Sequence, residues 1–307
     1  MKKVFIHIGA HKSASTTIQV NLSANSSILL EDYGVEYIGP SLIQSSDIGR
    51  HFKDLACGNL VDNDSYAKSL EAAKECFIDT ANEILSDNIL ISWEGFLGHS
   101  GLDKYQGIYP HSNKVSESIE YIFGEFNPRI LLIIRRQDDF IESCYLQQIK
   151  ECRSLSFSEF VDKIDINCLS WLDVYNSFNK YFENSITVFP FELIREIGTS
   201  NYIQHCMSNL LGFDLKVDNF VIHECLNPSF SEYGVNMSLE LLPKINESTR
   251  AELNKILFRQ LSSNKYGKAK YFNQFERKLI KDKCFQSNYD IFTKLNKEGI
   301  DTSYYLE

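Results

Sequence analysis

The chain has 307 residues, of which 43% are hydrophobic and 23% are charged, and its 31 Lys and Arg against 41 Asp and Glu give a formal net charge of −10 at pH 7. This composition supplies enough apolar side chains for a large core, which excludes a disordered chain, a collagen-like fibre and a coiled coil. The acidic balance argues against a nucleic-acid partner held by phosphate contacts, so any anionic ligand must meet a local cluster of positive charge.

Four short apolar runs stand out along the chain, at residues 4–8, 89–93, 130–134 and 186–189. Each run is rich in β-branched or aromatic residues and is too short for a helix, so each predicts a buried strand. Helical patterns lie between these runs, such as the apolar stripe within residues 119–126. Strands that alternate with helices predict a parallel sheet covered by helices on both faces.

Helical patterns dominate after about residue 191, with candidate helices near residues 200–212, 231–243, 247–261 and 273–296. No linker rich in Pro, Gly or Ser separates this part from the rest of the chain. We therefore expect one α/β domain over residues 1–307, whose C-terminal portion from about residue 191 is a helical layer.

The amino-terminal segment does not predict a secretion signal, because its apolar run reaches His7 and Gly9 too soon. No uninterrupted apolar stretch approaches the roughly 18 residues of a membrane-spanning helix. The eight cysteines show no CxxC pair and no metal-ligand spacing. We therefore expect a cytoplasmic protein without stable membrane insertion and without a metal site, and the sequence leaves its oligomeric state open.

The first apolar run leads into a small, hydroxyl-rich loop with the sequence His11-Lys12-Ser13-Ala14-Ser15-Thr16-Thr17, which opens a helical pattern. Backbone N–H groups of such a loop and helix start face a bound anion, and Lys12 adds a full positive charge. The structural alternative is a capped helix that follows a strand. A Walker A motif would need Gly and Lys where Ala14 and Ser15 stand, so that ATPase motif is absent.

A second candidate anion site follows the run at residues 130–134, where Arg135 and Arg136 precede a helical pattern that carries Ser143. Open α/β sheets bind ligands at the carboxyl ends of their strands. Arg135 can form two hydrogen bonds to a phosphate, and Ser143 can point back to the same group. The structural alternative pairs the two arginines with the acidic residues that follow them, Asp138, Asp139 and Glu142.

Together these two segments resemble the donor-binding sites of sulfotransferases that use 3′-phosphoadenosine 5′-phosphosulfate (PAPS). The loop at residues 11–19 is similar to the 5′-phosphosulfate loop of the family's bacterial branch, which shows a Lys-[Ser/Thr]-Gly-Thr-[Thr/Ser] run. Arg135 and Ser143 match the 3′-phosphate site, where a Ser follows an Arg by eight residues. The sequence departs from the family at Ala14, in a glycine position, and at Phe140, in the position of a second Arg, so that one phosphate contact is missing or comes from Arg136.

The resemblance implies a P-loop-like parallel sheet flanked by helices, and a metal-free transfer of the sulfuryl group of PAPS to a hydroxyl. The bacterial type of loop implies a carbohydrate or glycolipid acceptor. The resemblance also assigns donor binding to Lys12, Arg135, Ser143 and the loop residues Ser13, Ala14, Ser15, Thr16 and Thr17.

Within this interpretation Lys12 neutralises the charge that grows on the leaving phosphate oxygen. Glu94 directly follows the run at residues 89–93 and is the candidate base, with His11 beside the loop as the alternative. Two other functions stay open. One is a P-loop-like kinase that uses ATP and Mg²⁺, and the other is a degenerate module that holds a phosphoadenosine without turnover, which the departures at Ala14 and Phe140 would explain.

A run of basic residues between Lys265 and Lys283 holds seven Lys and Arg against one Glu and one Asp, which is a local charge of 7 − 2 = +5. Such runs are commonly solvated helix faces. The functional alternative is a contact for an anionic acceptor or for the 3′-phosphate of the donor.

Overall fold

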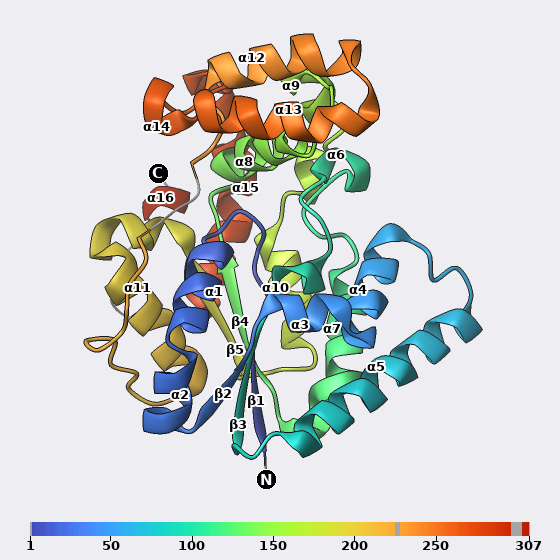
Figure 1. Cartoon of the computed structure of the whole chain (residues 1–307), viewed down its shortest axis with the longest axis vertical. Coiled ribbons are helices and arrows are strands. Elements are labelled where there is room, and N and C mark those ends of the chain that lie inside the picture. The colour runs from blue at the N-terminus through green and yellow to red at the C-terminus, as the bar shows by residue number, and fades with distance from the viewer. Residues whose placement is uncertain (1, 225–227, 296–302, 307) are drawn as a thin grey trace.

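The computed structural model describes residues 2–224, 228–295 and 303–306. Its centre is a five-stranded parallel sheet with the strand order β2-β3-β1-β4-β5 (Figure 1). The strands, in chain order, are β1 (Lys3–His7), β2 (Val35–Ile38), β3 (Asn88–Ser92), β4 (Arg129–Ile134) and β5 (Ile186–Pro190). The predicted α/β fold with a parallel sheet is confirmed.

The four predicted strands all form, and β2 is the strand that the sequence analysis missed. Its four residues, Val-Glu-Tyr-Ile, pair with β3 at one edge of the sheet. Only the first and last of them are buried, so β2 lacks the apolar run that marks the other strands.

Helices cover both faces of the sheet and separate the core into two apolar clusters (Figure 1). One face carries α1 (Ser15–Ala24), α2 (Ser26–Tyr33) and α11 (Ile194–Leu211). The other face carries α4 (Asp47–Cys57), α5 (Asn63–Glu83), α7 (Ser112–Phe123) and α10 (Trp171–Asn179). Neighbouring residues of one strand serve opposite faces, because Phe5 belongs to the first cluster and Ile6 to the second.

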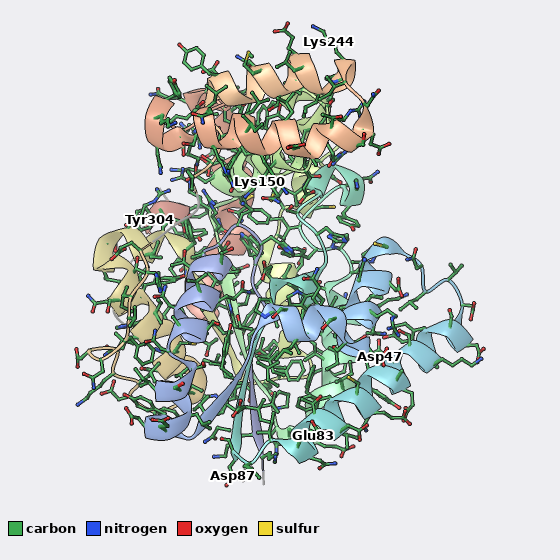
Figure 2. The ribbon with its side chains drawn as sticks, in the orientation of Figure 1. Asp47, Glu83, Asp87, Lys150, Lys244 and Tyr304 are labelled. Atoms are coloured by element: carbon green, nitrogen blue, oxygen red, sulfur yellow. The ribbon has the colours of Figure 1, made fainter. Side chains whose placement is uncertain are left out.

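A further group of helices lies beyond the carboxyl edge of the sheet. Figure 2 shows Asp87 at the amino edge and Lys150 at the other end of the sheet, beneath α12 and α13. The other α-helices of the described residues either belong to this group or connect other elements. They are α3 (Pro40–Ser45), α6 (Leu102–Tyr105), α8 (Gln137–Lys150), α9 (Phe157–Val161), α12 (Glu232–Leu241), α13 (Glu247–Gln260), α14 (Ser263–Tyr266), α15 (Gln274–Leu295) and α16 (Ser303–Leu306).

The helices expected after residue 191 correspond to α11, α12, α13 and α15, and residue 296 of the last one lies outside the described residues. α11 begins earlier than expected, at Ile194, and includes a kink at Gly198. Within the described residues, every helix is too short or too polar to cross a membrane.

A buried ion network fastens α15 to α8. Asp138 and Glu142 of α8 are fully buried, and Arg277 of α15 reaches both, at 2.6 Å and 2.7 Å. Glu142 also accepts the backbone N–H groups of Tyr271 and Phe272, which fixes the segment that leads into α15. One basic residue of the run between Lys265 and Lys283 is therefore structural.

We predict that Arg277→Met lowers the free energy of unfolding by about 3–5 kcal/mol, because it leaves buried Glu142 without its cation and Asp138 with Arg136 alone. Urea denaturation measures this change. Lys278→Met is the matched control, since Lys278 is the exposed neighbour of Arg277, and its effect should stay within about 0.5 kcal/mol. Equal effects of the two substitutions would contradict the structural role of the network.

Candidate functional site

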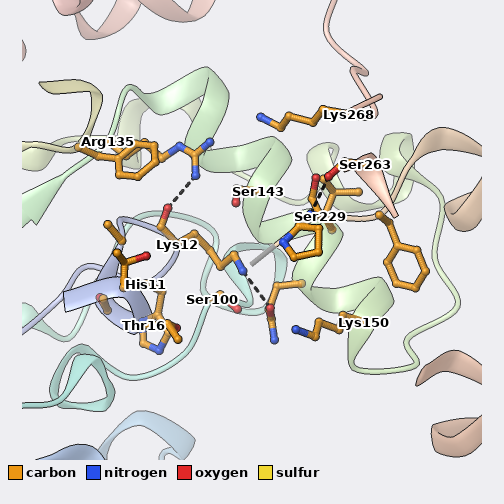
Figure 3. A pocket seen from close by; sticks show the side chains of 18 of the residues that line it. His11, Lys12, Thr16, Ser100, Arg135, Ser143, Lys150, Ser229, Ser263 and Lys268 are labelled. Carbon is orange, nitrogen blue, oxygen red and sulfur yellow. Dashed lines mark hydrogen bonds between the residues drawn. The ribbon is translucent and has the colours of Figure 1, made fainter. Parts of the chain in front are cut away.

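A cavity of about 690 Å³ opens beyond the carboxyl edge of the sheet (Figure 3). The loop after β1, the residues that follow β3 and β4, and residues of α8, α13 and α14 line it. Its basic side chains are Lys12, Arg135, Lys150, Arg195 and Lys268, and its acidic side chains are Glu94 and Glu151. Five cations against two carboxylates give this cavity a charge of 5 − 2 = +3, in a chain whose net charge is −10. An anionic ligand fits such a cavity.

The loop after β1 has the expected form of a strand, a turn and a helix start. Lys12 and Ala14 both adopt left-handed backbone conformations, with φ of 60° and 64°. Ala14 occupies the N-cap position of α1 and has no polar side chain to cap it. The first N–H groups of α1 therefore stay available to an anion, which favours the anion-binding interpretation over the capped helix.

The side chains of the loop divide between the cavity and the core. Ala14, Ser15, Thr16 and Thr17 line the cavity. Ser13 is fully buried and does not line it, and its hydroxyl lies 3.4 Å from the carbonyl oxygen of His11. The Ser13 side chain is therefore directed away from the cavity, and donor binding by Ser13 stays a prediction for its backbone.

Lys12 links the two predicted anion sites. Its carbonyl oxygen accepts a 2.7 Å hydrogen bond from the Arg135 guanidinium. Its ammonium donates to Oε1 of Gln147 at 3.1 Å, and Gln147 in turn donates to Glu151. Burial is the main cause that lowers the pKa of Lys12.

The two arginines after β4 have different roles. Arg135 lines the cavity, with its guanidinium 4.7 Å from the centre of the Phe191 ring, and burial lowers its pKa. Arg136 instead pairs with Asp138 at 2.6 Å and with Asp139 at 3.4 Å. The structural alternative thus holds for Arg136 alone, and Arg136 is not placed to supply the missing phosphate contact.

Ser143 faces the cavity from α8, whereas Phe140 is part of the core. The Phe140 ring packs against Trp171 with 5.0 Å between ring centres. The position that holds a second Arg in the resembled family is therefore apolar here. Lys268 and Arg195, which the motifs did not reveal, also line the cavity together with Arg135. Burial lowers the pKa of Lys268, and the positive charge of Arg135 lowers it further.

Glu94 follows β3 and begins a 3₁₀ turn, Glu94–Leu97, at the cavity wall. One of its carboxylate oxygens accepts a 2.6 Å hydrogen bond from the Gln19 amide of α1. The loop approaches it closely at Gly9, where φ is +104° and an added Cβ would lie 3.0 Å from the Glu94 Cβ. A side chain at position 9 would therefore push Glu94 away from the loop.

His11 also lines the cavity, and Tyr109 fixes its hydrogen bonds. The Tyr109 oxygen lies 2.9 Å from the His11 backbone nitrogen and 3.1 Å from Nδ1. Burial raises the pKa of Tyr109 well above its usual value, so the phenol keeps its proton. Because the phenol oxygen can accept the backbone N–H and either donate to Nδ1 or accept from it, the tautomer of His11 decides the direction of that second bond.

The same burial lowers the pKa of His11 to about 4, against the opposing effect of Glu94. His11 is therefore neutral at pH 7. Both candidate bases line the cavity, and Gln19 holds the Glu94 carboxylate in place.

Several lining residues escaped the sequence analysis, and some of them had a signal. Ser143, Gln147 and Lys150 lie at i, i+4 and i+7 on α8, so the stripe that contains Ser143 could have identified the other two. Lys268 did not escape the sequence analysis entirely, because it belongs to the basic run between Lys265 and Lys283, whose functional alternative is a contact for an anion. No group of three or more potential metal ligands occurs among the residues that the structure describes.

Comparison with family models and with curated proteins gives no match. Among solved structures, the mouse sulfotransferase SULT7A1 complexed with PAP is similar over 70% of this chain and 60% of that chain, with a TM-score of 0.38 and 11% sequence identity. The similarity thus spans less than two thirds of the mouse protein. Function has to be argued from the residues of the cavity.

We predict that Ala14→Gly stabilises the protein by about 1 kcal/mol, because glycine removes the cost of a left-handed residue. Urea denaturation measures the change. Ala67→Gly is the matched control, since Ala67 is exposed within α5, and it should destabilise by about 1 kcal/mol. Destabilisation by both substitutions would show that position 14 does not require a left-handed conformation.

Proposed function

We propose that the chain is a sulfotransferase that moves the sulfuryl group of PAPS to a hydroxyl of a carbohydrate or glycolipid acceptor. The observation that carries the proposal is the meeting of the two resembled segments in one positively charged cavity. Lys12 and Arg135 are 123 positions apart in the sequence and are joined by a hydrogen bond. Both segments face the same space, as one nucleotide with two separate phosphate groups requires.

The residues of the cavity suggest how the donor lies. The 5′-phosphosulfate would face the start of α1, where uncapped N–H groups and the residues Ser15, Thr16 and Thr17 lie. The 3′-phosphate would face Arg135 and Ser143. Lys268 and Arg195, from later segments of the chain, would supply the positive charge that the second arginine supplies in the family pattern.

Transfer would form a bond between the acceptor oxygen and sulfur while the bond between sulfur and the bridging phosphate oxygen breaks. Lys12 and the N–H groups of the loop would stabilise the charge that develops on the leaving oxygen. In this conformation the Lys12 ammonium donates to Gln147, so it would exchange that amide for the nucleotide. Glu94 would take the proton of the acceptor hydroxyl, with its carboxylate held in place by Gln19.

Calorimetry tests the class of ligand. We expect 3′-phosphoadenosine 5′-phosphate (PAP) to bind without Mg²⁺ and more tightly than ATP with Mg²⁺. Binding of ATP with Mg²⁺ but not of PAP would contradict the proposal and favour the kinase. Binding of PAP without release of PAP from PAPS, over a range of sugar acceptors, would instead identify the degenerate module.

We predict that Arg135→Ala weakens PAP binding by about one to two decades, because a charge-assisted hydrogen bond contributes about 1.5–3 kcal/mol. Calorimetry also gives the comparison with adenosine 5′-phosphosulfate, which lacks the 3′-phosphate and should lose clearly less affinity, because Arg135 acts on its phosphosulfate only through the Lys12 carbonyl. Arg259→Ala, at an exposed position of α13, is the control. Equal losses for both nucleotides would refute the assignment of Arg135.

We predict that Glu94→Gln lowers turnover by about 10²- to 10⁴-fold, because the amide keeps the shape of the carboxylate but cannot accept the proton. Turnover is measured as PAP released from PAPS, and the dissociation constant of PAP should stay nearly unchanged. His11→Asn should lower turnover much less. The reverse result, with Glu94→Gln active and His11→Asn inactive, would make His11 the base.

A further inference from the structure

A chain of hydrogen bonds leads from α6 to the cavity wall at Ser100. The buried carboxylate of Asp103 holds the Arg153 guanidinium through two bonds, of 2.9 Å and 2.7 Å. Arg153 also donates to Oε1 of Gln148 at 2.6 Å. The Gln148 amide nitrogen then lies 3.2 Å from the hydroxyl oxygen of Ser100, which lines the cavity.

The direction of each bond in this chain is fixed by chemistry. A guanidinium can only donate, so the Gln148 atom that faces Arg153 must be the oxygen. The Gln148 nitrogen therefore donates to Ser100, whose oxygen acts as the acceptor. Within the described residues no acceptor is found for the Ser100 proton, so the hydroxyl is left as a donor at the cavity wall.

Lys150 supplies a positive charge in the same part of the cavity. Its ammonium lies 4.5 Å from the centre of the Phe258 ring. None of the ion pairs found among the described residues includes Lys150. Its charge contributes to the lowered pKa of Lys12, after the larger effect of burial, so the two amines share one space.

Ser100 and Lys150 lie apart from the proposed 3′-phosphate site. Figure 3 shows both of them below Lys12, whereas Arg135 and Lys268 lie above it. Glu94, the proposed base, lines the same cavity. An acceptor that presents its hydroxyl to Glu94 would therefore share this cavity with Ser100 and Lys150.

We infer that Ser100 and Lys150 form an acceptor subsite for an acidic sugar, whose carboxylate or phosphate ester accepts hydrogen bonds from both. That the bound sugar is the acceptor rests on the proposed function. Binding of an anionic sugar at this subsite does not. A hydroxyl donor and an ammonium without a carboxylate partner gain most from an anion. A neutral sugar would leave the charge of Lys150 without a counter-charge.

Binding to the PAP-saturated protein tests the subsite, because PAP then fills the donor site. Calorimetry compares trigalacturonic acid with its methyl ester, which has the same sugars without the charge, and galactose 6-phosphate with galactose. We expect at least one charged probe to bind about tenfold tighter than its neutral counterpart, and the probe that does so distinguishes a carboxylate from a phosphate ester. Lys150→Gln should remove this preference, and Ser100→Ala should weaken binding of the charged probe by about three- to tenfold.

Lys255→Gln, at an exposed position of α13, is the matched control and should leave the preference unchanged. Equal binding of charged and neutral probes, a preference that survives Lys150→Gln, or no binding of any probe would overturn the inference. If PAP itself does not bind, the proposed function fails separately. The same probes are then added to the protein alone, and loss of the charge preference in Lys150→Gln but not in Arg135→Ala would still support the subsite.

Discussion

The hydrogen bond from the Arg135 guanidinium to the Lys12 carbonyl is the contact on which the site depends. It joins the ends of β1 and β4, which are neighbours in the sheet, and so holds the loop against the start of α8. Two residues of the loop other than glycine, Lys12 and Ala14, have left-handed backbone conformations. Because such conformations are unfavourable, the loop needs a stabilising contact from outside. Phe191 stacks on the same guanidinium and limits its movement.

Within a few positions after β4, some charged side chains form ion pairs in the core and another, Arg135, faces the cavity. Asp138 and Glu142 face inward and are neutralised by Arg136 and Arg277. These partners neutralise the buried carboxylates, and Arg135 faces the cavity. The position of α15, far along the chain, therefore decides which arginine is available to a ligand.

The sequence predicted the parts of the fold that depend on local pattern and left out the parts that depend on packing. Apolar runs identified four strands, but β2 has two partly exposed residues and no such run. The motifs predicted the loop and Arg135, since spacing along a strand and helix determines both. Spacing could not show that Arg136 pairs with Asp138 or that Ser13 is buried, and it gave no sign of Ser100, because long-range contacts decide those positions.

The concentration of cations around the cavity has an energetic consequence for the empty protein. Burial lowers the pKa of Lys12, Arg135 and Lys268, and neighbouring cations lower it further, whereas Asp139 raises the pKa of Arg135 and of Lys268. A multivalent anion that enters the cavity would offset the repulsion between these cations. Simple sulfate should therefore raise the melting temperature of the protein more than chloride at equal ionic strength.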